Sequence, residues 1–225
     1  MAPSSRAAGS VAAAIVARRV AWAVLWLLAL AVVLHFLWGT FHKYAPQDPN
    51  AYGMFWSRRA WLWTHLAGGT LTALLGPWQF IARLRNAYPR AHRWTGRVYL
   101  SAMLVACVGA AGLIATTPGG FALQAAFAAT ALAWLCTALP GYIAIRAGRT
   151  QDHRRWMLRN YIVTLAPMVF RLSIQVPGMM ALAHPAVLIP TLLWLSWAAP
   201  LLVYELTSAI ARWVRRAPTP QAELA

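Results

Sequence analysis

The chain has 225 residues, of which 60% are hydrophobic and only 11% are charged, and its formal net charge is +16. This composition is untypical of a soluble domain, and several apolar runs reach the roughly 20 residues that span a bilayer as a helix. The arginines lie in short segments between these runs and not on one solvated face, which argues against nucleic-acid binding. We therefore interpret the sequence as that of a polytopic membrane protein.

The apolar runs predict an all-α fold, a six-helix transmembrane bundle, between two polar tails. The N-terminal tail is expected over residues 1–19, the transmembrane domain over residues 20–210 and the C-terminal tail over residues 211–225. Within the domain, we expect helices over residues 20–39, 60–82, 92–116, 121–145, 153–176 and 185–210. Proline, glycine and asparagine residues mark the connections between them.

The distribution of basic residues predicts the orientation of these helices. With a cytoplasmic N-terminus, 16 basic residues fall on the inner side of the membrane and only Lys43, Arg58 and Arg59 fall outside. Because basic loops are retained in the cytoplasm, both tails are expected to be cytoplasmic.

The second predicted helix carries a stripe of small residues beneath a histidine. His65, Gly68, Gly69, Thr72 and Gly76 recur at helical spacing and share one face. Such a thin face allows either close packing of a second helix or close approach of a ligand.

The fifth predicted helix carries a polar stripe made of His153, Asn160, Thr164, Arg171 and Gln175. Exposure of these polar side chains to lipid costs free energy, so the stripe is expected to face the bundle interior or a water-filled cavity. Arg171 is the most informative of them, since a charge at the bilayer centre costs about 2.5–3.5 kcal/mol or more. A simpler interpretation is that Arg171 extends its charged group to the membrane surface.

Depth along the helices predicts a ligand site in the outer half of the bundle. The residues that would form it are His35, His65, Gln124, Arg171 and Gln175. No acidic residue is expected at that depth, so carbonyl groups, water, a lipid phosphate or an anionic ligand would neutralise Arg171.

A motif occurs twice, at the inner ends of the third and fifth predicted helices. His92-Arg93-Trp94-x-x-Arg97-x-Tyr99 is echoed by His153-Arg154-Arg155-Trp156-x-x-Arg159-x-Tyr161, which suggests duplication of a helical hairpin. One interpretation is an inner-face anion or cofactor site formed by His92, Arg93, Arg97, His153, Arg154 and Arg159. The other is that both copies only anchor their helices at the lipid headgroups.

These motifs resemble a known family. The segments HLAGGTLTALLGPWQFIARLR, HRWTGRVYL and HRRWMLRNY, with Arg171 downstream, resemble the bacterial membrane-protein family catalogued as domain of unknown function 2306. The resemblance covers about residues 65–175 and implies a multi-helix protein of the bacterial inner membrane with no established activity.

A weaker similarity is to diheme b-type membrane cytochromes, which have a helix start like His92-Arg93-Trp94-Thr95-Gly96. It would imply haem b held by His35 with His65, or by His92 with His153. The fourth predicted helix has no histidine, which departs from the arrangement of those cytochromes.

Three functions therefore remain open. The first is binding or transport of a small anionic ligand or lipid, the second is electron transfer through haem b, and the third is a structural or assembly role without a ligand. The four acidic residues make no catalytic pair, and no hydrolase or nucleotide-binding motif is present, so whether the protein is an enzyme stays undecided. Membrane lipids are the expected partners, and the sequence does not indicate a protein partner.

Overall fold

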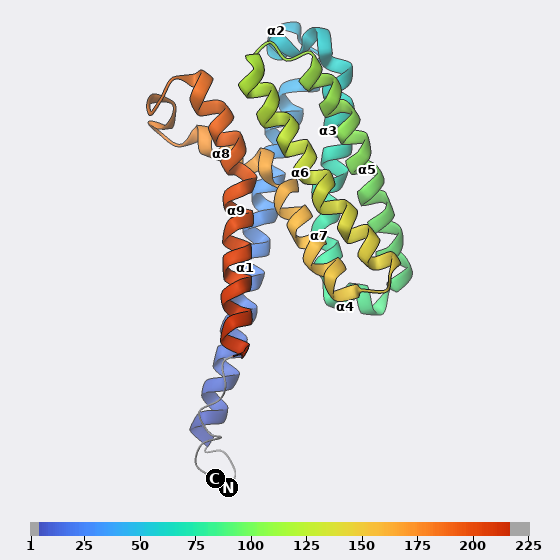
Figure 1. The fold of residues 1–225 in the computed structure, drawn as a ribbon, viewed down its shortest axis with the longest axis vertical. Coiled ribbons are helices and arrows are strands. Elements are labelled where there is room, and N and C mark those ends of the chain that lie inside the picture. The colour runs from blue at the N-terminus through green and yellow to red at the C-terminus, as the bar shows by residue number, and fades with distance from the viewer. Residues whose placement is uncertain (1–4, 217–225) are drawn as a thin grey trace.

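The computed structural model describes the backbone of residues 5–216 and the side chains of residues 13–214, and within that range the regular elements are helices (Figure 1). In chain order they are α1 (Ser5–Tyr44), α2 (Pro49–Tyr52), η1 (Gly53–Arg58), α3 (Arg59–Phe80), α4 (Ala82–Ala87), α5 (Pro89–Ala115), α6 (Gly120–Arg146), α7 (Thr150–Thr164), α8 (Ala166–Gln175), η2 (Met179–Ala181) and α9 (Pro185–Arg216). We call the two ends of the molecule the α2 end, at the top of Figure 1, and the α4 end.

The predicted helices agree well with the observed ones, with two differences in their extent. Helix α1 begins at Ser5, so it includes most of the expected N-terminal tail. Helix α9 continues to Arg216, and the remaining expected tail residues, 1–4 and 217–225, lie outside the described part of the chain. The expected loop after α1 contains α2 and η1, and the expected turn before α5 contains α4.

The helix expected over residues 153–176 is divided into α7 and α8. Pro167 explains the division, because a proline has no N–H to bond to the carbonyl four residues earlier and disfavours helical geometry in the residue before it. At the break, the Leu165 amide lies 3.2 Å from the carbonyl oxygens of both Tyr161 and Ile162, and the Met168 amide donates to the Leu165 carbonyl at 3.0 Å. Helix α8 therefore takes a direction different from that of α7 (Figure 1).

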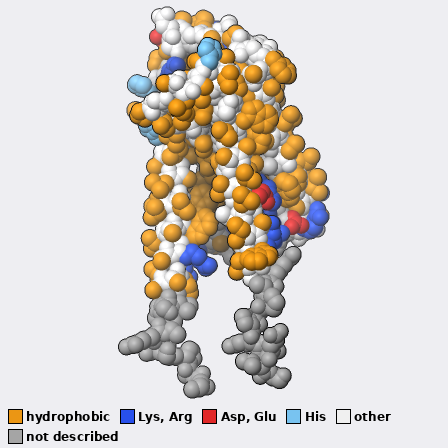
Figure 2. Space-filling view, turned by 60° about the vertical axis from the view of Figure 1, so that its left-hand side comes forward, with side chains coloured by type: hydrophobic (Ala, Val, Ile, Leu, Met, Phe, Trp, Pro, Cys, Tyr) orange, Lys and Arg blue, Asp and Glu red, His pale blue; other side chains and the backbone are white. Residues whose placement is uncertain are grey.

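Within residues 5–216, four helices are long and apolar enough to cross a membrane. They contain the spans Ala13–Tyr44, Pro89–Ala115, Gly120–Arg146 and Pro185–Val214. Their surfaces are correspondingly apolar, with Leu27 on α1 66% exposed and Phe121 on α6 84% exposed. Hydrophobic side chains cover most of the face shown in Figure 2. The protein is therefore a helical membrane protein with at least these four candidate spans.

The most extensive packing occurs between α3 and α5 and between α6 and α7. Glycines allow α3 and α5 to approach at backbone distance, because a Cβ on Gly68 would overlap the Ala102 carbonyl and one on Gly109 would overlap the His65 amide. A Cβ on Gly76 would likewise overlap the ring of Tyr161. Helices α1 and α9 flank this group, and both also contact α8.

Candidate functional site

The polar stripe of the fifth predicted helix has two different environments because the helix is broken. His153, Asn160 and Thr164 lie on α7, within the packed group of helices, whereas Arg171 and Gln175 lie on α8. Asn160 and Thr164 are buried, while Arg171 and Gln175 are exposed. The break at Leu165 therefore separates the interior part of the stripe from its exposed part.

The α7 part of the stripe belongs to a buried hydrogen-bond network that joins α5, α6 and α7. The Tyr99 hydroxyl donates to Asn160 Oδ1 at 2.6 Å and lies 2.9 Å from Thr164 Oγ1. The Trp134 indole N–H donates to Thr164 Oγ1 at 2.8 Å, and Asn160 Nδ2 donates to the Trp134 carbonyl at 2.8 Å. Because every side chain in this network has partners inside the protein, it has no need of a ligand.

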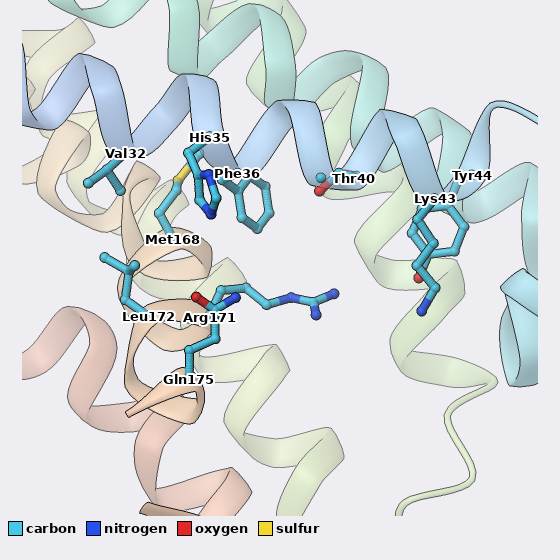
Figure 3. Close-up of a pocket in the computed structure, with 11 residues that line it drawn as sticks. Val32, His35, Phe36, Thr40, Lys43, Tyr44, Met168, Arg171, Leu172 and Gln175 are labelled. Carbon is cyan, nitrogen blue, oxygen red and sulfur yellow. The ribbon is translucent and has the colours of Figure 1, made fainter. Parts of the chain in front are cut away.

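The α8 part of the stripe lines a groove of about 220 Å³ between α1 and α8, which we call the α1–α8 groove. It is lined by Val32, His35, Phe36, Gly39, Thr40, Lys43, Tyr44, Met168, Arg171, Leu172 and Gln175. In Figure 3, the Arg171 side chain extends along the groove toward Lys43, and the His35 ring projects into the groove from α1. The structure thus brings together His35, Arg171 and Gln175 of the predicted cluster.

The charges in the α1–α8 groove are not neutralised by any of the described side chains. The ion pairs among the described residues are Arg155–Asp152 and Arg159–Glu205, and neither involves this groove. Within the same range, no side-chain hydrogen bond is formed by Arg171 or by Lys43, whose ammonium group lies 5.2 Å from the centre of the Tyr44 ring. Two cations therefore share one groove without an anionic partner from residues 13–214.

A larger cavity of about 410 Å³ adjoins the groove, and we call it the interior cavity. Its wall is mostly aliphatic and aromatic, and it also contains Arg58, His65 and Arg171. The groove and the interior cavity have Phe36, Thr40, Tyr44, Met168 and Arg171 in common. Arg171 thus lies where a charged groove meets an apolar cavity.

The remaining members of the predicted outer cluster are placed differently. His65 lines the interior cavity, and its Nδ1 lies 3.0 Å from the Ala106 carbonyl oxygen. Gln124 lines neither space, because its amide donates to the Thr117 carbonyl at 3.1 Å where α5 connects to α6. His35 and His65 line different spaces, so the structure does not place these two rings in one cavity as a shared haem would require.

Two functional candidates were missed by sequence reasoning, which assigned Lys43 and Arg58 only to the outer loop. Arg58 is 6% exposed, and its guanidinium donates to the carbonyl of Leu113 and the hydroxyl of Thr117 at 3.3 Å each. It thereby binds the last turn of α5 and also lines the interior cavity. The neighbouring aromatic residue Phe55, whose ring centre lies 4.9 Å from the guanidinium, was the available signal for burial.

The repeated motif has the same local geometry in both copies at the α4 end. Arg97 lies over the Trp94 ring at 5.0 Å, and Arg159 lies over the Trp156 ring at 4.7 Å. The tyrosines that close the two copies, Tyr99 and Tyr161, are buried, and the Tyr161 hydroxyl donates to the Ala73 carbonyl at 3.1 Å. The motif therefore combines a cation–π pair at the helix end with a tyrosine that bonds to a neighbouring helix.

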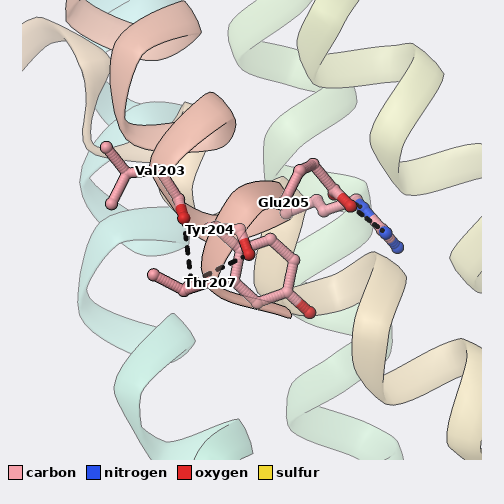
Figure 4. A network of polar contacts seen from close by, with 5 residues as sticks. Val203, Tyr204, Glu205 and Thr207 are labelled. Atoms are coloured by element: carbon pink, nitrogen blue, oxygen red, sulfur yellow. Dashed lines mark hydrogen bonds and ion pairs between the residues drawn. The ribbon is translucent and has the colours of Figure 1, made fainter. Parts of the chain in front are cut away.

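Arg159 is already paired, which makes it a poor member of the predicted inner-face anion site. Its Nε and Nη2 atoms donate to the two Glu205 carboxylate oxygens of α9 at 2.5 and 3.0 Å. Figure 4 shows Glu205 in this pair, two residues before Thr207, whose hydroxyl donates to the Val203 and Tyr204 carbonyls at 2.8 and 3.0 Å. Glu205 thus neutralises a member of the repeated motif and not Arg171.

The other predicted inner-face residues lie at the starts of α5 and α7. His153 Nδ1 lies 2.9 Å from the Gly141 carbonyl oxygen of α6, whereas His92 Nδ1 is buried and has no hydrogen-bond partner among residues 13–214. Arg93, Arg97 and Arg154 are exposed. The two histidines therefore have different environments although their motifs match.

Comparison with known proteins identifies the family. Residues 62–208 match the family model described as "Predicted membrane protein (DUF2306)", and the chain belongs to this family. The match extends from the first turn of α3 through most of α9 and includes both copies of the motif. No curated protein and no solved structure matches the chain significantly.

Proposed function

We propose that this DUF2306 protein crosses the bacterial cytoplasmic membrane six times and binds an anionic small molecule or lipid in the α1–α8 groove. The two spans beyond the four most apolar ones would be α3 and the α7–α8 pair, in which the polar residues Asn160 and Thr164 are buried against other helices. The basic segments around α4 and between α6 and α7 support a cytoplasmic α4 end, while Lys43, Arg58 and Arg59 remain at the α2 end.

The observation that carries the ligand proposal is the unpaired charge of Arg171 in the groove that Lys43 also lines. Arg171 is exposed at the protein surface, and a charged side chain exposed to the apolar part of a bilayer is costly unless an opposite charge or strong hydrogen bonds compensate for it. A carboxylate or phosphate group between Arg171 and Lys43 would accept charge-assisted hydrogen bonds from both. The Gln175 amide and the His35 ring would supply further polar contacts at the same groove.

The test is a thermal-unfolding titration of the detergent-purified protein with butyl phosphate, a short soluble anion, at constant ionic strength. A ligand that binds only the folded state raises the unfolding temperature with its concentration. We expect this rise in the wild type, a smaller rise in Lys43→Gln and none in Arg171→Gln.

Arg59→Gln is the matched control, because Arg59 is an exposed basic residue of the same end and lies over the Trp56 ring, 4.5 Å from its centre, outside the groove. This variant should respond like the wild type. The proposal is refuted if the wild type shows no rise, or if Arg171→Gln shows the same rise.

Haem binding is the second candidate, and one observation favours it. The Nδ1 atom of His65 is engaged by the Ala106 carbonyl, which leaves Nε2 as the nitrogen available for an axial bond in the interior cavity. This arrangement would use His65 alone and not the predicted pairs. A visible spectrum of protein from haem-supplied cells, before and after dithionite, tests it: a Soret band lost in His65→Ala supports this candidate, and a featureless spectrum rejects it.

A further inference from the structure

The two spaces around Arg171 differ in chemistry although they share a wall. Four of the residues that line the α1–α8 groove, His35, Lys43, Arg171 and Gln175, are charged or strongly polar. The interior cavity is instead lined mainly by apolar side chains, among them Leu66, Phe127, Phe170, Ile174, Ile189 and Leu193. A molecule that reached from one space into the other would need a polar end and an apolar end.

The interior cavity is large enough for a ligand and unsuited to water. Its volume of about 410 Å³ lies within the range of small-molecule sites, roughly 300–1,000 Å³. Apolar cavities do not hold water well, because a buried water needs two to four polar partners. An apolar chain is therefore the occupant with the lowest desolvation cost in this cavity.

The backbone of α3 leaves room for such a chain. Gly69 lines the interior cavity, and a Cβ added to it would have no other atom within 4 Å. The preceding residue, Gly68, has the opposite environment, since its Cβ would overlap the backbone of α5. Of these two adjacent glycines, Gly68 is therefore required by helix packing, whereas Gly69 keeps the cavity open.

We infer that the ligand is an anionic amphiphile with a single apolar chain, bound with its head group at Arg171 and Lys43 and its chain in the interior cavity. The inference rests on the proposed function, to which it adds the class of the ligand. The boundary residues Phe36, Thr40, Tyr44 and Met168, together with Arg171, form the passage between head group and chain. Long-chain fatty acids and alkyl phosphates share this chemistry.

Gly69→Leu tests the inference because its side chain would enter the interior cavity without reaching the groove. Ala67→Leu is the matched control, because Ala67 is an exposed residue of the same helix and lines neither space. Both variants, the wild type and Arg171→Gln are titrated with butyl phosphate and with dodecyl phosphate in a sterol-based detergent, which has no acyl chain to compete. Dodecanoate in a parallel titration distinguishes a carboxylate from a phosphate head group.

We expect dodecyl phosphate to bind the wild type and Ala67→Leu at least tenfold more tightly than butyl phosphate. Burial of each methylene contributes up to about fourfold, so even partial burial of the chain exceeds this threshold. In Gly69→Leu the preference for the long chain should fall to less than threefold, while butyl phosphate still binds. Arg171→Gln should bind neither compound.

The outcomes separate the two proposals. If butyl phosphate binds the wild type but Gly69→Leu keeps the full preference for the long chain, the chain lies elsewhere and this inference is overturned while the proposed function stands. If the wild type binds neither compound, both are overturned. A dodecyl phosphate with a diazirine at the chain end gives an independent readout: crosslinks to Phe170 or Leu193 support the inference, and crosslinks confined to the exposed face of α1 contradict it.

Discussion

Helices α7 and α8 carry the two halves of one polar stripe, and the two halves differ in burial and in hydrogen bonding. On α7, Asn160 is fully buried and bonded to Tyr99 and Trp134 of two other helices. On α8, Arg171 has no bonded partner in the described part of the chain and lines two spaces. Polar residues of one stripe therefore bond to neighbouring helices where such helices surround them. Where α8 diverges from the packed helices, the polar residues remain free to bind a ligand.

A similar contrast between a packed and an open position exists at the adjacent glycines of α3, Gly68 and Gly69. Substitution of these two residues should give the largest difference in stability between two variants. Gly68→Leu should lower the free energy of unfolding by about 3 kcal/mol or more, because its side chain would overlap the backbone of α5. Gly69→Leu should be neutral or raise it by up to about 1 kcal/mol, since leucine favours helix more than glycine does. Thermal unfolding of the two purified variants checks this difference, and equal destabilisation would contradict it.

The buried network should give the next largest effect. Asn160→Ala removes the acceptor of the Tyr99 hydroxyl and the donor to the Trp134 carbonyl and the Thr137 hydroxyl. The unsatisfied groups should cost about 1–3 kcal/mol of stability without changing the response to butyl phosphate. Chemical denaturation measures the loss, and unchanged stability would show that the network contributes little. Loss of the anion response in a folded Asn160→Ala protein would show that α7 and α8 are not independent.

The ion pair at the α4 end should give a smaller effect. Glu205→Gln removes the carboxylate partner of Arg159, but the Glu205 side chain is 41% exposed, so the expected loss is below about 1 kcal/mol. Asp152→Asn is the control, because its pair with Arg155 is longer, at 3.7 Å, and more exposed. It should show no measurable loss of stability. A loss above 2 kcal/mol in Glu205→Gln would assign the pair a larger role in joining α7 to α9.

The sequence was sufficient to predict the helices and the stripe because both depend on local periodicity. The bounds expected for the third and fourth helices agree with α5 and α6 to within three residues. Sequence also placed Arg171 and Gln175 on one face, and their spacing is preserved in α8. The break at Pro167 was not predicted, although the proline itself was the signal for it.

The contents of the site were harder to predict because they depend on which helices become neighbours. Lys43 and Arg58 belong to the same short region of the sequence, yet one lines the α1–α8 groove and the other lines the interior cavity. Gln124 lies near the start of α6, but it bonds to the segment that connects α5 to α6. Similarly, nothing in the repeated motif indicated that α9 would supply Glu205 to Arg159, whereas Arg97 stacks on Trp94 and has no ion pair among the described side chains.

Arg171→Gln should have little effect on the stability of the ligand-free protein and the largest effect on ligand retention. The substitution removes a charge that has no ion pair with residues 13–214, so no ion pair within the described side chains is lost. Unfolding of delipidated protein should therefore show a change within about 0.5 kcal/mol. A large destabilisation in that state would mean that Arg171 has a structural role.

The most direct measurement is native mass spectrometry of the protein released gently from the membrane in which it was made. The wild type and Arg59→Gln should both carry an additional mass that dissociates as a single-chain anion, and Arg171→Gln should lack it. A wild-type spectrum without any bound mass, or an identical bound mass in Arg171→Gln, would contradict the claim that Arg171 holds a ligand.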